Sequence, residues 1–137
     1  MQSDLPKASS IMIIDGDTLK GNFPTLPPVF GKDLEIRIRG IDTPEIHSDI
    51  PKVKWWALKA KEYLAKALQS CLTVTFKKPT RDKFFRIDAD VYFDDLNIGP
   101  EMIRLKFAKP YNGGTKIPWT EQDIPNEPST ETPKQAP

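Results

Sequence analysis

Residues 34–45 have the sequence LEIRIRGIDTPE, in which a strand pattern runs directly into a turn. Leu34, Ile36 and Ile38 alternate with charged residues, which predicts a half-buried strand because successive side chains point to opposite faces. Pro44 has no amide hydrogen and keeps the residue before it out of helical geometry, so a fixed turn is expected there. The stretch predicts a domain built mainly from short, half-buried strands.

Other segments repeat the same alternation. Asp-Gly at 15–16 separates the extended runs 11–14 and 17–19, and this pair is typical of a two-residue hairpin because glycine tolerates positive φ. Residues 72–76 and 86–93 alternate in the same way, with a basic turn between them. We expect five short strands, interpreted as antiparallel.

Helical patterns complete the domain. Apolar residues recur at helical spacing from Trp55 to Gln69, which predicts the main helix, after a mobile loop at 46–54. Gly99-Pro100 is expected to open a short second helix that ends near Phe107. The order of elements predicts an α+β, mainly β fold. Its form is a five-stranded OB-fold-like barrel with one main capping helix and a short second helix.

Length and composition limit the organisation. The 137 residues suit one domain, which we place at 9–119, after a flexible N-terminus at 1–8 and before a Pro-rich disordered tail at 120–137. The formal net charge of +1 gives no global electrostatic case for nucleic acid, so such binding must come from a local site. No apolar run reaches the ~18–20 residues of a membrane helix, so no membrane partner is expected. The lone Cys71 excludes an internal disulfide. With no dimer-forming motif in view, we expect a monomer.

Acidic and basic residues gather in the predicted turns and at strand ends. Asp17 lies at the hairpin turn, Asp42 and Glu45 lie in the proline turn, and Arg37 and Arg86 project outward from strands. Carboxylate oxygens suit calcium or magnesium, and guanidinium groups bind phosphate oxygens in pairs. Together they predict a site that holds a phosphodiester with a hard cation. Taken singly, each residue also fits turn chemistry or a solvated surface.

Three motifs resemble the staphylococcal nuclease (thermonuclease) family. They are IDGDT at 14–18, RIRGIDTPE at 37–45 and RDKFFR at 81–86. The segment AKPYNGG at 108–114 is similar to the C-terminal signature of small bacterial and plasmid-borne members, and the whole resemblance spans about residues 9–114. It implies a five-stranded barrel that hydrolyses the P–O5′ bond of DNA and RNA and leaves 3′-phosphate ends.

The resemblance also implies a calcium site. Asp17 and Asp42 would bind Ca²⁺ through their carboxylates, and Thr43 would bind it through its backbone carbonyl. The cation would act as Lewis acid and template for the phosphodiester.

Three catalytic residues follow from the same motifs. Glu45 would position or deprotonate the attacking water, and Arg37 would bridge the phosphate. Arg86 would stabilise charge nearer the leaving 5′-oxygen. Preorganised charge of this kind is usually the largest catalytic contribution.

Substrate contacts are expected from Lys83, Phe84 and Tyr111. Lys83 belongs to a basic turn that would contact the phosphate backbone or remain solvated. Phe84 would stack on a base, although Phe84-Phe85 stands where family members often have Tyr-Gly. Tyr111 would stack on a nucleotide or serve in packing.

Two other functions compete with a nuclease that acts on DNA and RNA, with single strands preferred. The same barrel without catalysis would be a module that binds single-stranded nucleic acid. Alternatively, the Pro-rich tail at 120–137 would recruit protein partners, and its deletion would then abolish function. Localisation is open in the sequence. We expect export, because an unrestrained nuclease endangers the cytoplasm.

Overall fold

The central sheet runs in the order β1-β2-β3-β6-β5, with the short β7 paired to β6. The computed structural model describes residues 4–81 and 86–126 of the chain. A second, two-stranded sheet joins β4 and β8. The elements are β1 (Ser10–Asp15), β2 (Thr18–Asn22), α1 (Pro28–Gly31), β3 (Leu34–Ile38), β4 (Ile41–Asp42), α2 (Pro51–Ser70), β5 (Val74–Arg81), β6 (Ile87–Phe93), β7 (Leu96–Asn97), α3 (Ile98–Arg104), β8 (Lys109–Pro110) and the 3-10 helix η1 (Glu121–Asp123).

The predicted fold class is confirmed: the chain is mainly β, OB-fold-like, with one main helix. One detail was wrong, because β3 and β6 pair in parallel rather than antiparallel. Alternation shows which residues share a face but not which strand is the neighbour. Between β3 and β6 the chain passes through α2 and β5, and that long connection returns β6 in the direction of β3.

The sheet is open between its edge strands β1 and β5, since no ladder joins them within the part of the chain that is described. The N-terminal segment partly spans this gap, where Leu5 N–H donates a hydrogen bond to the Phe76 carbonyl at 3.0 Å. Leu5 and Ala8 also pack against the core. Residues 4–8 are therefore anchored, which corrects the predicted flexibility for that part of the N-terminus.

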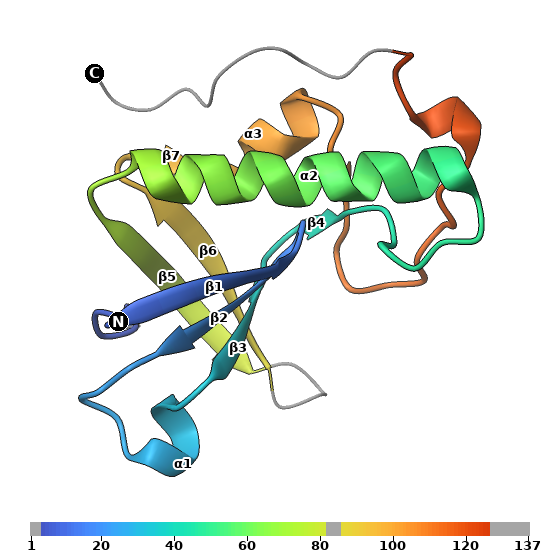
Figure 1. Cartoon of the computed structure of the whole chain (residues 1–137). Helices are drawn as coiled ribbons and strands as arrows, with labels where there is room; N and C mark the ends of the chain where they lie inside the picture. Colours follow the sequence, from blue (N-terminus) through green and yellow to red (C-terminus); the bar gives the residue numbers. More distant parts are fainter. Residues whose placement is uncertain (1–3, 82–85, 127–137) are drawn as a thin grey trace.

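Helix α2 lies across one end of the sheet, and α1 lies at the opposite end (Figure 1). Helix α2 begins at Pro51, so the predicted loop at 46–54 is helical in its last part. A proline fits the first turn because its missing amide hydrogen has no intrahelical partner there. Trp56 is fully buried, stacks on Phe107 with ring centroids 4.5 Å apart, and donates its Nε1–H to the Lys106 carbonyl at 2.8 Å. None of the helices in 4–81 and 86–126 is long and apolar enough to cross a bilayer.

The folded domain continues beyond residue 119. Residues 121–123 form η1, which begins after a Thr120 capping box. Trp119 and Ile124 are 8% and 5% exposed and belong to the core cluster. The predicted disorder of 120–137 is therefore wrong for 120–126, because these two apolar anchors fix the backbone despite the Pro-rich composition. Residues 127–137 lie outside the described chain.

We expect Ile124→Ala to lower the free energy of unfolding by about 2 kcal/mol, since it removes a buried branched side chain from the core. The measurement is a urea titration of the full chain. Gln122→Ala, at an exposed position of the same 3-10 helix, is the matched control and should change stability by less than about 0.5 kcal/mol. Equal midpoints for the two variants would contradict the packing of this segment.

Candidate active site

Three chain segments meet at one end of the central sheet. The β1–β2 turn carries Asp17, the end of β3 carries Arg37, and the segment after β4 carries Thr43. The ladder between β2 and β3 pairs Thr18 with Arg37, and Ile38 N–H donates to the Asp17 carbonyl at 2.8 Å. This register brings Asp17 Oδ2 to 3.6 Å from Arg37 Nη2, with both side chains about nine-tenths buried.

The Asp17 carboxylate joins these segments. The Thr18 hydroxyl donates to Oδ1 at 3.0 Å, and the Thr43 amide donates to Oδ2 at 3.4 Å. Gly16 permits the approach: a Cβ there would lie 3.0 Å from the Ala60 Cβ of α2 and 3.1 Å from the Thr43 side chain. The glycine is therefore needed for close packing of the turn beneath α2. Its φ is not positive, so the left-handed backbone predicted for it was wrong.

Asp15 and Asp17 form a crowded acidic pair. Burial, together with the hydrogen bond and the charge of Asp17, raises the pKa of Asp15 to about 7. Burial opposes ionisation of Asp17 too, but the hydrogen bond from Asp15 and the charge of Arg37 outweigh it and lower the pKa of Asp17. The pair thus holds a proton near neutral pH. Sequence reasoning assigned Asp15 to the hairpin turn alone, although the DGD motif at 15–17 separates two carboxylates by a single glycine.

Arg37 does not project into solvent, so the outward orientation predicted for it was wrong. The residue is 8% exposed, and its Nη2 donates to the Ile41 carbonyl at 2.9 Å. Its guanidinium carbon lies 5.3 Å from the centre of the Tyr111 ring. Arg37 is covered by the segment around β4 and by the C-terminal segment that carries Tyr111, which alternation within one strand does not reveal.

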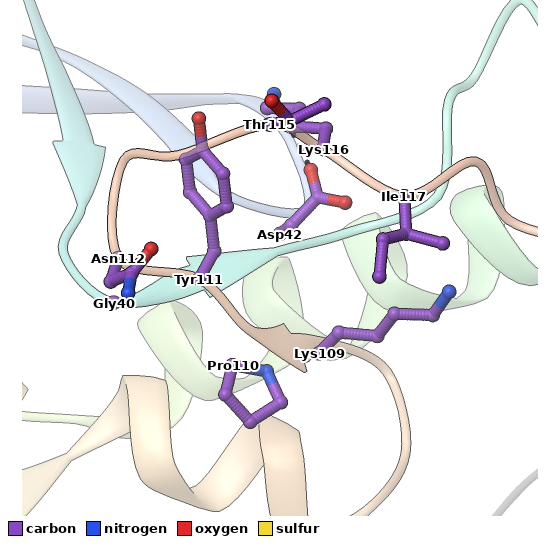
Figure 2. Close-up of a pocket in the computed structure, with 9 residues that line it drawn as sticks. All are labelled: Gly40, Asp42, Lys109, Pro110, Tyr111, Asn112, Thr115, Lys116 and Ile117. Atoms are coloured by element: carbon purple, nitrogen blue, oxygen red, sulfur yellow. Dashed lines mark ion pairs between the residues drawn. The ribbon is translucent and has the colours of Figure 1, made fainter.

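Asp42 is buried and engaged from the C-terminal segment. The Trp119 Nε1–H donates to Oδ2 at 3.1 Å, and the Lys116 ammonium lies 3.3 Å from Oδ1. Figure 2 shows Lys116 beside the Asp42 carboxylate, on the segment that follows Tyr111. Sequence reasoning missed both partners, because nothing in a Pro- and Gly-rich segment indicates which carboxylate it will cover.

Two cavities flank this contact, and both are lined by Asp42, Lys116 and Ile117. The first has a volume of about 350 Å³ and is drawn in Figure 2. The second has about 530 Å³, within the range of small-molecule sites. The first is also lined by Gly40, Lys109, Pro110, Tyr111, Asn112 and Thr115, and the second by Thr43, Glu45, His47, Ser48, Asp49, Ile50, Val53, Pro118 and Trp119.

Glu45 and Arg86 lie in separate surroundings. Glu45 is exposed and lines the larger cavity together with Asp42 and Thr43. Arg86 is half-buried and directly precedes β6, whose parallel pairing with β3 sets Ile87 beside Ile36. Arg86 thus lies just before the strand that pairs with the strand carrying Arg37. The catalytic roles of Glu45, Arg37 and Arg86 stay predictions.

The predicted substrate residues have different outcomes. Lys83 and Phe84 lie outside the described residues. Tyr111 lies at the site, but its ring is flanked by Arg37 and by Lys116, whose Nζ is 5.5 Å from the ring centre. Its hydroxyl donates to the Gly114 carbonyl at 2.7 Å. A stacked base would have to share or displace these contacts, so the nucleotide role of Tyr111 stays a prediction.

The donors present fit a hard cation. Asp17, Asp42 and the Thr43 carbonyl offer oxygen ligands, which calcium prefers, with water completing its six to eight positions. Within 4–81 and 86–126 no three His, Cys, Asp or Glu side chains are grouped closely enough to hold a metal, so the protein would supply few ligands. The crowded pair of Asp15 and Asp17, which needs a proton near pH 7, would be relieved by a nearby positive charge.

OB-fold-like domains form a class that commonly binds oligonucleotides. The buried arginine at one end of this sheet is a group that can bind phosphate oxygens in pairs. Residues 35–126, more than half of the chain, match the family model described as staphylococcal nuclease homologue, and the chain belongs to this family. The predicted resemblance is confirmed, although the 14–18 motif precedes the matched range. Membership makes this a nuclease-type domain of a nucleic-acid-binding family that is generally calcium-dependent.

One protein to which the chain is similar is described as uncharacterized. An uncharacterized protein of Methanocaldococcus jannaschii, MJ1439, is 27% identical over 124 residues, which cover 74% of this chain and 57% of that protein. The chain thus spans a little over half the length of this relative.

We expect Asp15 to make the metal-free protein less stable as pH rises. The pKa of Asp15 is about 7 in the folded protein and 3.8 as the ordinary value, so the folded state binds a proton more tightly than the unfolded state. The stability from this difference is fully present below pH 3.8 and is lost as pH rises through 7. The lowered pKa of Asp17 acts only at more acidic pH. Asp15→Asn should therefore raise stability at pH 8 by about 1 kcal/mol, less than full linkage because solvent screens the carboxyl.

The measurement is the urea midpoint in chelator between pH 5 and 8. Asp95→Asn, an exposed carboxylate in the β6–β7 turn, is the charge-matched control. If the Asp15 and Asp95 variants follow the wild-type pH profile equally, the buried acidic pair does not hold the proton.

Proposed function

We propose that this chain is a calcium-dependent phosphodiesterase that hydrolyses the P–O5′ bond of DNA and RNA and leaves 3′-phosphate ends, with single strands preferred. The observation that supports it most is the buried contact of Asp17 with Arg37 and Thr43, next to the buried Asp42. Burying charges on three separate segments is costly unless they are paired. A site for a cation and an anionic substrate gives that arrangement a purpose.

Arg37 is suited to the scissile phosphate. Its contacts with Asp17 and with the Ile41 carbonyl both use Nη2, so the guanidinium is held rigidly from one end. The remaining edge of the fork is where two phosphate oxygens would bind. Because the group stays charged at any working pH and is already oriented, it stabilises developing negative charge with little reorganisation.

Glu45 and Arg86 would complete the reaction. Glu45, exposed to water in the larger cavity, would orient a water molecule and accept its proton as the oxygen attacks phosphorus. The P–O5′ bond then breaks, and Arg86 would stabilise the departing 5′-oxygen until it takes up a proton. Calcium, held by Asp17, Asp42 and the Thr43 carbonyl, would supply Lewis acidity and orientation.

One observation favours a second candidate, a catalytically weak or dead module that binds single-stranded nucleic acid. Lys116 already neutralises Asp42, so the carboxylate has a partner without any metal. A domain that only binds phosphates could retain this pair permanently.

The nuclease proposal further includes monomeric action and export, the latter because free nuclease activity endangers cytoplasmic nucleic acid.

The decisive experiment is digestion of single- and double-stranded DNA and RNA with calcium, with magnesium and with chelator. We expect calcium-dependent cleavage that leaves 3′-phosphate ends. Glu45→Gln should reduce kcat by about 10²–10³, and Arg37→Lys by a similar factor, because the lysine loses the forked geometry. Glu121→Gln, at an exposed position of η1, is the charge-matched control and should retain wild-type rates.

A different outcome separates the two candidates. No cleavage under any condition, together with tight and salt-sensitive binding of single strands, would replace the enzyme by the binding module. Thermal unfolding of the Arg37 variant is measured in parallel, since loss of a buried ion pair also lowers stability.

A further inference from the structure

Both oxygens of the Asp42 carboxylate are held by one short segment of the chain. Trp119 Nε1 lies 3.1 Å from Oδ2, and Lys116 Nζ lies 3.3 Å from Oδ1. The Asp42 side chain is only 8% exposed. A cation that binds Asp42 therefore has to compete with a group that the protein itself provides.

The two contacts differ in how firmly they are held. Trp119 is 8% exposed, belongs to the core, and has the Lys109 ammonium 4.6 Å from the centre of its ring. Lys116 is 43% exposed and lies between the exposed residues Thr115 and Ile117. The indole N–H is thus a fixed donor that orients Oδ2. The ammonium on Oδ1 is held by charge on a solvent-facing segment and is free to exchange.

We propose that Lys116 is a tethered cation that occupies Oδ1 of Asp42 in the metal-free protein and sets the affinity of the site for calcium. The inference rests on the proposed function, since it concerns the same calcium site. Calcium displaces the ammonium from Oδ1, while Trp119 keeps the carboxylate in place through Oδ2. The displaced ammonium has another anchor nearby, the Tyr111 ring at 5.5 Å.

Competition explains how a buried carboxylate is kept ready for a metal. An unpaired buried charge is strongly destabilising, whereas a strong permanent partner would exclude the metal. A single ammonium on a long side chain stabilises the empty site at modest cost to calcium binding. It also makes calcium affinity depend on a residue that need not touch the metal.

The test is direct calcium binding by isothermal titration calorimetry, without substrate. Lys116→Gln should lower the Kd for calcium roughly 3- to 10-fold, the factor expected when a partly exposed ion pair no longer competes. Lys116→Arg keeps the charge and should bind calcium no more tightly than wild type. Lys54→Gln, an exposed lysine of α2, makes the same charge change and should stay within about twofold of wild type.

A second readout uses urea unfolding. In chelator Lys116→Gln should unfold at a lower urea midpoint than wild type, because Asp42 loses its counter-charge, and saturating calcium should restore it. Equal calcium Kd values for wild type and Lys116→Gln, or weaker binding by the variant, would overturn the tethered cation while leaving the nuclease intact. Failure of every variant and of wild type to bind calcium would overturn both.

Discussion

The ion pair between Asp17 and Arg37 is the contact on which the rest of the site depends. Both side chains are about nine-tenths buried, so each supplies the other with an opposite charge inside the protein. The same carboxylate accepts the amide of Thr43, which fixes the segment after β4 against the β1–β2 turn. One buried carboxylate thus positions three segments that are distant in sequence, and the groups that we propose to bind metal and phosphate lie on those segments.

The C-terminal segment is the second part of the same construction. Trp119 and Ile124 are buried in the core, and the chain between β8 and η1 thereby lies across Asp42. The two sheets and the β1–β2 turn supply Asp17, Asp42 and Arg37, whereas this segment decides how open they are to solvent. Two cavities separated by Lys116 follow from that covering, and access to Asp42 is controlled by a part of the chain with little regular structure.

Local patterns predicted the fold class, a hairpin in this region, whose turn lies at Gly16-Asp17, and the strand that carries Arg37, because alternation and turn chemistry depend on neighbouring residues. They also identified carboxylates that the structure buries at one end of the sheet. The burial of Arg37 and the partners of Asp42 could not be predicted this way. Both arise where segments far apart in sequence meet, and only tertiary packing determines that meeting. The parallel pairing of β3 with β6 escaped for the same reason.

Charge balance at the site is consistent with the cation that we propose. Burial and the neighbouring Asp17 raise the pKa of Asp15, so this acidic pair carries crowded negative charge. Arg37 is shared between Asp17 and a carbonyl, and the Lys116 ammonium lies beside Asp42. A phosphodiester brings a further negative charge to this balance. In the proposed reaction a divalent cation bound by the carboxylates would offset this charge, and Arg37 would bind the phosphate through the remaining edge of its guanidinium.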